Sequence, residues 1–71
     1  MSIEALNSRN QYRGKIRDVV WGDVLSEIEV ETPGGVVSSL VTTRSINELG
    51  LHVGSEVLAT FKATEVFLAR I

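Results

Sequence analysis

Residues 24 to 31 alternate strictly between two kinds of side chain, and this alternation constrains the fold more than any other feature of the sequence. One set is small and mostly apolar, and the other is mostly acidic: Val24, Ser26, Ile28 and Val30 against Leu25, Glu27, Glu29 and Glu31. Because successive side chains of a strand point to opposite faces, the pattern predicts a strand with one buried and one solvent-exposed face. A shift of the strand pairing by one residue would expose all the buried side chains, so the sequence specifies which face of this strand packs on the core.

Four other segments also have the composition of strands: residues 11–21, 36–42, 56–62 and 65–70. Gly14 interrupts the first of them, where a missing side chain often marks a bend or the close approach of another backbone. The last contains the continuously apolar run Val66–Ala69, which is typical of a strand covered on both faces.

Turn and helix signals separate these strands. Gly22-Asp23 predicts a type II′ hairpin turn, and Thr32-Pro33-Gly34-Gly35 predicts a second turn. Residues 43–50 predict one or two turns of helix, because Ser45 and Glu48 have capping-box spacing and Gly50 is placed to end the helix. Five strands with one short helix between the third and fourth predict an all-β fold, a small five-stranded Greek-key barrel of the OB type.

The size of the chain predicts a single domain spanning residues 1–71. Such a small domain buries only about 60% of its unfolded surface, yet 44% of the residues are hydrophobic, so we expect some apolar surface to face another subunit. The formal net charge of -2 argues against a general nucleic-acid or membrane binder. Residues 1–6 lack the basic and apolar parts of a signal peptide, which predicts a cytoplasmic protein.

Two short polar segments have the chemistry of an oxyanion site. Asn7-Ser8-Arg9-Asn10-Gln11 is joined to the first strand, and Lys62-Ala63-Thr64 lies at the end of the fourth. Each combines a fixed cation with hydroxyl or amide donors and backbone N–H groups. A tetrahedral dianion offers only acceptors, so its host must supply donors from every side. Neither segment suffices alone, and we expect folding or assembly of several copies to bring them together.

Three segments, in order, resemble the molbindins and the related molybdate-binding domains of sensors and transporters: NSRNQYRGKI, VTTRSINELGLHVGSEV and FKATEV. The resemblance covers about residues 7 to 69. It implies a protein that is not an enzyme and that binds molybdate, or its near-isostere tungstate, for intracellular storage. It also implies a homo-oligomer, a hexamer built as a trimer of dimers, with the anion sites between subunits.

The resemblance also assigns roles to the first polar segment. Arg9 matches the signature arginine, and Ser8 falls where alanine is common and offers its backbone N–H. Asn7 stands where the family usually has serine, whose hydroxyl donates to the anion. Asparagine can donate through its NH₂ group, but its side chain is longer than that of serine and its amide oxygen repels an anion. The affinity for the anion, or the choice of anion, can therefore differ from that of the family.

The remaining assignments fall in the second half of the chain. Lys62, Ala63 and Thr64 match the family's lysine-alanine-serine segment, with Thr64 keeping the hydroxyl. Thr42 and Ser45 match hydroxyl residues that are expected to arrive from a neighbouring subunit. A purely structural role stays open for both residues, because threonine is common in strands and Ser45 can act as a helix N-cap.

Two other functions stay open on the sequence alone. The stripe Arg13, Lys15 and Arg17 suits an OB-type nucleic-acid-binding module, although Glu27, Glu29 and Glu31 can balance it across the hairpin and stacking aromatics are few. A ligand-free oligomerisation or regulatory domain of the same fold is the other, motivated by Asn7. No nucleophile-base constellation and no metal-ligand spacing are visible.

Overall fold

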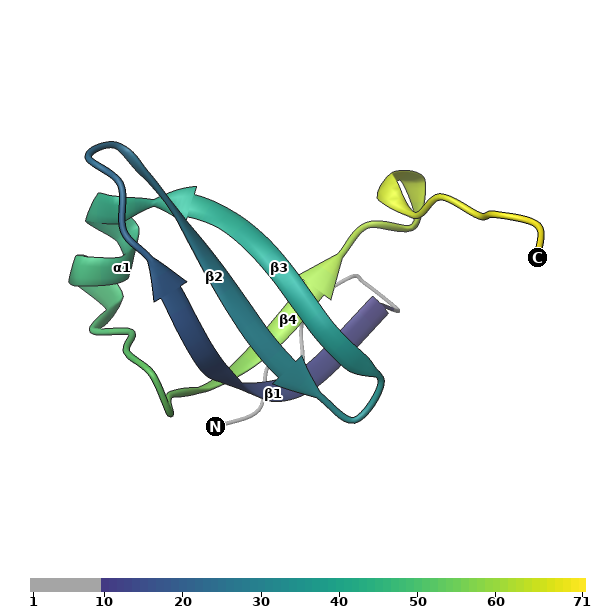
Figure 1. The fold of residues 1–71 in the computed structure, drawn as a ribbon, viewed down its shortest axis with the longest axis horizontal. Helices are drawn as coiled ribbons and strands as arrows, with labels where there is room; N and C mark the ends of the chain where they lie inside the picture. Colours follow the sequence, from purple (N-terminus) through teal and green to yellow (C-terminus); the bar gives the residue numbers. More distant parts are fainter. Residues whose placement is uncertain (1–9) are drawn as a thin grey trace.

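One strongly curled antiparallel sheet with a short helix at one end forms the body of the protein (Figure 1). The computed structural model describes residues 10–71. The strands are β1 (Asn10–Val20), β2 (Leu25–Thr32), β3 (Gly35–Thr42) and β4 (Glu56–Phe61). Helix α1 (Thr43–Leu49) lies between β3 and β4, and the 3-10 helix η1 (Ala63–Glu65) follows β4. The strand order β3-β2-β1-β4 makes β3 and β4 the two edges, so the all-β architecture with one helix between the third and fourth strands is confirmed.

The alternation in β2 places its buried face as the sequence predicts. Ser26, Ile28 and Val30 are buried and Glu27 and Glu29 lie on the opposite face. Val24 is the exception, because β2 begins one residue later and its side chain is exposed. The fully buried apolar core of the described chain consists of Ile16, Ile28, Val30 and Ile46.

A β-bulge lets β1 contribute to this core at two positions that are three residues apart. Ile16 pairs with Val30 and Val19 pairs with Ile28, with the register shifting between Ile16 and Asp18. The extra residue, Arg17, stays on the outer face, where its guanidinium lies 3.5 Å from the Glu29 carboxylate. A strict two-residue period does not allow this spacing, which is why the sequence pattern of β1 is less regular than that of β2.

Gly14 marks a close approach of neighbouring backbone, as its position within the strand predicts. A Cβ atom there would collide with the backbone oxygen of Glu31 and would lie 2.8 Å from Val30 Cγ1 and 2.9 Å from Thr32 Cγ2. Real Cβ atoms do not tolerate such contacts. Glycine is therefore required where β1 crosses the end of β2.

The connection between β1 and β2 differs from the predicted type II′ turn. Four residues separate the strands, and Gly22 does not have the positive φ that such a turn needs. Its backbone is fixed by side chains instead, since its N–H donates to Ser26 Oγ (3.1 Å) and its carbonyl accepts from Thr43 Oγ1 (2.7 Å). A Cβ atom on Gly22 would collide with the Leu25 carbonyl, so glycine is needed for space and not for its φ.

Helix α1 has the predicted bounds but a different cap. The N-cap is Thr42, whose Oγ1 accepts a hydrogen bond from the Ser45 N–H at 3.1 Å. The capping box predicted from Ser45 and Glu48 is wrong, because Ser45 already lies in the first helical turn. Gly50 ends the helix as predicted: it has φ 64°, and the following Leu51 N–H donates to the Ile46 carbonyl at 3.0 Å, which is a Schellman motif.

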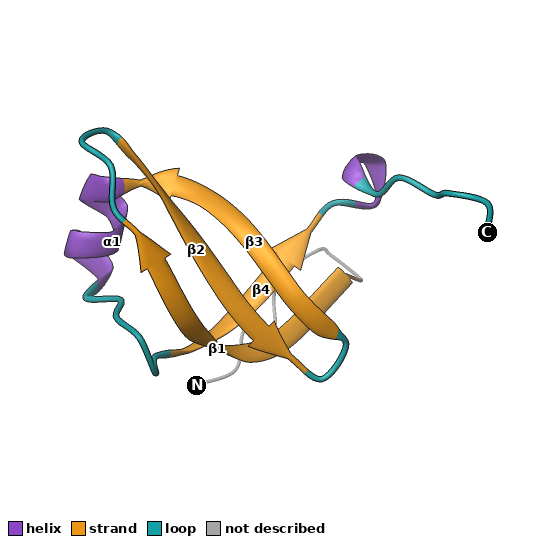
Figure 2. Ribbon diagram, in the orientation of Figure 1, coloured by secondary structure: helices purple, strands orange, loops and turns teal. Residues whose placement is uncertain are grey.

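The predicted fifth strand, Glu65–Arg70, is not a strand in the structure. Glu65 ends η1, and residues 66–71 are irregular and lead away from the sheet (Figure 2). Phe67 and Leu68 are 92% and 94% exposed. A strand needs a neighbour for its backbone hydrogen bonds, and the segment has none among the described residues. Residues 10–71 therefore form four strands, and a five-stranded barrel is not formed by this part of the chain.

Candidate anion-binding site

Half of the predicted site begins where β4 ends, beside the start of β1. Asn10 and Phe61 are register partners in the antiparallel β1–β4 pair. Asn10 directly follows the segment Asn7-Ser8-Arg9, and Phe61 directly precedes Lys62-Ala63-Thr64. Asn7, Ser8 and Arg9 themselves lie outside the described residues. The pairing therefore places the residue that follows the first polar segment in the sequence opposite the residue that precedes the second.

Lys62-Ala63-Thr64 presents donors that the described part of the chain does not use. All three residues are exposed. Lys62 is extended and precedes η1, whose internal bonds run from the Glu65 N–H to the Lys62 carbonyl (2.9 Å) and from the Val66 N–H to the Ala63 carbonyl (3.3 Å). Within residues 10–71 no acceptor meets the N–H groups of Ala63 and Thr64, the Lys62 ammonium or the Thr64 hydroxyl. The segment offers one cation and three further donors.

Thr42 and Ser45 form a hydroxyl pair at the other end of the sheet. Their Oγ atoms are 2.6 Å apart, so one hydroxyl hydrogen lies between them. The other hydrogen can donate outward, because within the described residues neither hydroxyl has a further acceptor. Capping the helix and donating to a ligand are therefore compatible for this pair.

The two clusters of donors do not meet within one chain. Thr42 pairs with Leu25 beside the β1–β2 hairpin tip, whereas Lys62 follows the residue that pairs with Asn10. The eleven residues of β1 run between these two ends (Figure 1). A ligand that contacts Lys62 in one copy can reach Thr42 and Ser45 only from another copy.

A second hydroxyl cluster, which the sequence did not predict, has a structural role. Ser26 Oγ and Thr43 Oγ1 are 2.6 Å apart, and together they bind the N–H and carbonyl of Gly22. Ser26 is 2% exposed. A serine on the apolar face of a predicted strand is the signal that could have revealed the cluster, because a buried hydroxyl needs partners. It ties the hairpin to the start of α1.

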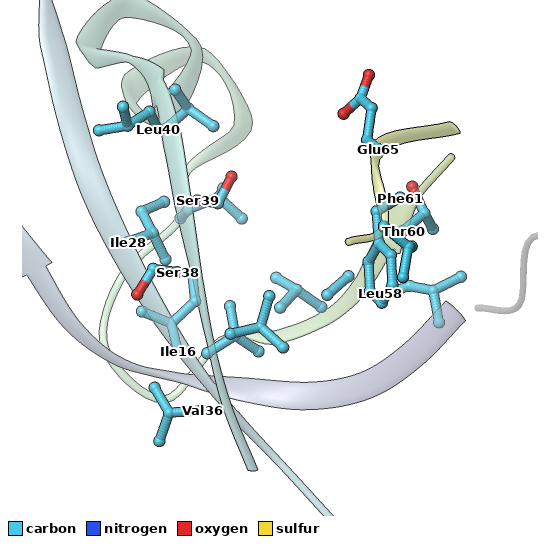
Figure 3. Close-up of a pocket in the computed structure, with 17 residues that line it drawn as sticks. Ile16, Ile28, Val36, Ser38, Ser39, Leu40, Leu58, Thr60, Phe61 and Glu65 are labelled. Carbon is cyan, nitrogen blue, oxygen red and sulfur yellow. The ribbon is translucent and has the colours of Figure 1, made fainter. Parts of the chain in front are cut away.

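An apolar groove opens between the edge strands β3 and β4 (Figure 3). Its volume is about 750 Å³. Ile16 and Ile28 lie at its base, with side chains of β3 on one wall and Leu58 and Phe61 of β4 on the other (Figure 3). An apolar lining cannot compensate the lost hydration of a dianion. The groove is therefore not the anion site.

The basic stripe of β1 is largely neutralised by β2. Arg17 is paired with Glu29, and Lys15 lies opposite Glu31 in the register. Tyr12 packs against Phe61 with ring centroids 5.7 Å apart, so these rings contact each other. The geometry gives little support to a track for nucleic-acid phosphates.

Residues 10–71 lack two further features. No group of three or more His, Asp or Glu side chains is arranged to hold a metal ion in this part of the chain. No helix formed by residues 10–71 has the length and apolar character to cross a membrane.

Comparison with known proteins gives consistent matches over nearly the whole chain. Residues 7–68 match the model of the TOBE domain. A molybdenum-pterin-binding protein of Clostridium pasteurianum is 37% identical over 65 residues, which cover 90% of this chain and 96% of that protein.

Solved structures share the fold. The structure of MopII from Clostridium pasteurianum matches with a TM-score of 0.86 and 33% identity, covering 93% of this chain and all of that one. The structure of a molybdate-binding protein from Sporomusa ovata also has a TM-score of 0.86, with 27% identity and coverage of 94% and 100%.

Proposed function

Because the chain belongs to the TOBE domain family, we propose that it binds molybdate and serves to store or buffer this oxyanion. The sequence resemblance to molbindins is confirmed by the same matches. Its relatives are named as binding proteins, and the proposal accordingly assigns the protein no catalytic step. The site residues, the assembly and the location below are parts of this proposal.

One observation supports the site more than any other: the register pair Asn10 and Phe61. It pairs the two residues that adjoin the cation-bearing segments in the sequence. In the proposed site Arg9 and Lys62 neutralise the dianion. The Asn7 amide, the Thr64 hydroxyl and the backbone N–H groups of Ser8 and Ala63 donate to its oxygens.

Thr42 and Ser45 complete the proposed site from a neighbouring copy. Their hydroxyl pair retains one hydrogen for an outside acceptor, and it lies at the end of the sheet opposite Lys62. A site shared in this way requires an oligomer. We propose the hexamer that the molbindin resemblance implies, a trimer of dimers.

The proposal has further parts that the sequence motivates. Residues 1–71 act as a single domain located in the cytoplasm, and the barrel gains its fifth strand on assembly. Tungstate, as a near-isostere, should compete with molybdate for the same donors. Sulfate offers the same four acceptor oxygens but is smaller, so selection against it depends on the size of the site.

Calorimetric titration of the purified protein tests this function. We expect saturable binding of molybdate, competition by tungstate and a weak response to sulfate at near-physiological salt. Equilibrium dialysis should accompany the titration, because a binding heat can vanish through compensation. If neither method detects molybdate, the proposal is wrong and the chain is better described as a ligand-free assembly domain.

A further inference from the structure

Three hydroxyl side chains lie at the start of helix α1, and the structure gives them different surroundings. Thr42 and Ser45, which we call the outward pair, are in contact through their exposed hydroxyls and belong to the proposed anion site. Thr43 lies between them in the sequence. Its hydroxyl is directed instead to the β1–β2 hairpin, where it donates to the Gly22 carbonyl at 2.7 Å. The sequence Thr-Thr-Arg-Ser does not by itself separate these roles.

The hydroxyl of Thr43 is one member of a closed ring of hydrogen bonds, which we call the hydroxyl ring. A hydroxyl has one hydrogen, and Thr43 uses its hydrogen on the Gly22 carbonyl. The hydrogen in the 2.6 Å contact between Ser26 Oγ and Thr43 Oγ1 therefore belongs to Ser26. Ser26 Oγ in turn accepts from the Gly22 N–H at 3.1 Å. Both hydroxyl hydrogens are used within the ring, so neither Ser26 nor Thr43 retains a donor for an anion.

Thr43 is held to the hairpin by its backbone as well. Its N–H donates to the Val24 carbonyl at 2.8 Å, so the first residue of α1 is fixed at two points beside the hairpin tip (Figure 1). The support on the β2 side is firm, because Ser26 is 2% exposed and lies within the strand. These anchors determine where α1 begins and in which direction it leaves β3.

The position of Thr43 determines where the hydroxyls of the outward pair lie. Thr42 directly precedes Thr43, and Ser45 follows it within the same helical turn. The Ser45 N–H donates to Thr42 Oγ1 at 3.1 Å, and the two Oγ atoms are 2.6 Å apart. This arrangement requires the first turn of α1 to keep its geometry. Donors that are already held in place bind a ligand better than donors that must be ordered on binding.

We propose that the hydroxyl ring of Gly22, Ser26 and Thr43 positions the outward pair for anion binding. Ser26 and Thr43 are then positioning residues, since they contact no anion and act through the pair. The inference rests on the proposed function and extends it to two residues outside the site. Mutation of residues that orient metal ligands typically changes affinity 10- to 100-fold. We expect about 10-fold here, because the pair supplies only some of the donors.

Thr43→Val tests the proposal, because it keeps the shape of the side chain and removes the hydroxyl. Thr32→Val is the matched control. The Thr32 hydroxyl also donates to a backbone carbonyl, that of Gly35 (2.7 Å), and accepts from a backbone N–H, that of Gly34 (3.2 Å), but it does so in the β2–β3 turn. The molybdate dissociation constant measured by calorimetry should rise about 10-fold for Thr43→Val and stay near the wild-type value for Thr32→Val. Thr43→Ser retains the hydroxyl and should bind as the wild type does.

The comparison has two results that would overturn the proposal. One is a Thr43→Val protein that binds molybdate as tightly as the wild type. The other is an equal loss of affinity in both valine variants, since any weakening of the fold would then weaken binding. If Thr43→Val does not fold, Ser26→Ala opens the same ring at another member and takes its place in the comparison.

A measurement without molybdate separates this inference from the proposed function. Amide hydrogen exchange at Ser45, followed by NMR, reports on the hydrogen bond from its N–H to Thr42. Exchange should be faster in Thr43→Val than in the wild type and unchanged in Thr32→Val. Unchanged exchange in Thr43→Val would overturn the inference whatever the anion affinity. A wild-type protein that binds no molybdate would contradict the proposed function, and the exchange rate would still decide whether the hydroxyl ring holds the outward pair.

Discussion

At the scale of single residues, mutation can distinguish a lysine that binds the anion from a lysine that only pairs within the sheet. The chain has two lysines, Lys15 and Lys62. Lys15 lies opposite Glu31 within the sheet, whereas Lys62 has no ion pair within residues 10–71. This difference makes them a matched pair for mutation.

Lys62→Ala should weaken molybdate binding while leaving the fold intact. A charge-assisted hydrogen bond is worth about 1.5–3 kcal/mol, so the dissociation constant should rise on the order of 10- to 100-fold. Lys15→Ala should change it little. Calorimetry on both variants checks the prediction, and equal affinities would remove Lys62 from the site.

At Gly14 a side chain would collide with three neighbouring atoms. Gly14→Ala should reduce the free energy of unfolding by about 1–3 kcal/mol, because the new methyl group collides with the β2 backbone. Gly34→Ala is the control, since its Cβ would meet nothing closer than 3.8 Å and should change stability by about 0.5 kcal/mol or less. Urea titrations of both variants measure the difference. Equal stabilities of the two variants would contradict the crowding at position 14.

At the scale of elements, Thr42 couples the start of helix α1 to the proposed site. Thr42→Val removes the acceptor for the Ser45 N–H and should cost about 1 kcal/mol of stability. It also removes a hydroxyl from the pair and should weaken molybdate binding. Thr42→Ser keeps the oxygen and should preserve both properties. A Thr42→Val protein that is less stable but binds molybdate normally would leave Thr42 with a capping role alone.

Elements whose patterns depend on neighbouring residues were predictable from the sequence. The face of β2 follows from strict alternation, and the end of α1 follows from Gly50, whose φ of 64° suits glycine. Gly14 was recognisable by its place within a strand. Each of these three features is set by the local sequence, and the packing of distant residues has to be compatible with it.

Elements that depend on distant residues were not predictable. The loop at Gly22 is shaped by Ser26 and by Thr43, which is 21 residues away from Gly22. The sequence therefore could not show that position 22 needs glycine because a side chain would not fit. The β1 bulge is specified by pairing with β2. Of the site, the sequence supplied the residue types, but the separation of Thr42 from Lys62 became visible only in the fold.

At the scale of the whole molecule, residues 10–71 bury four apolar residues, which is a small core for a chain that is 44% hydrophobic. Burying one large apolar side chain contributes about 1.5–3 kcal/mol, and the segment after η1 exposes Phe67, Leu68 and Ile71. We therefore expect the burial of apolar side chains between copies to contribute much of the protein's stability. The stability of such a protein depends on its concentration.

Molybdate should stabilise the assembly by mass action, because its proposed site exists only there. At a free concentration of 100 times the dissociation constant, each site should contribute about 2.7 kcal/mol. The thermal midpoint should therefore rise with molybdate and not with sulfate, and dilution should dissociate the anion-free form more readily. Scanning calorimetry at several protein concentrations checks both effects. A midpoint insensitive to molybdate would argue against a shared site.

Native mass spectrometry with and without molybdate tests most directly whether copies of the chain share the anion. It weighs each assembly and counts the anions bound to it in the same spectrum. We predict that molybdate appears only on oligomers and that their proportion increases when it is added. Molybdate bound stoichiometrically to the monomer, or absent from every species at saturating concentration, would contradict the account.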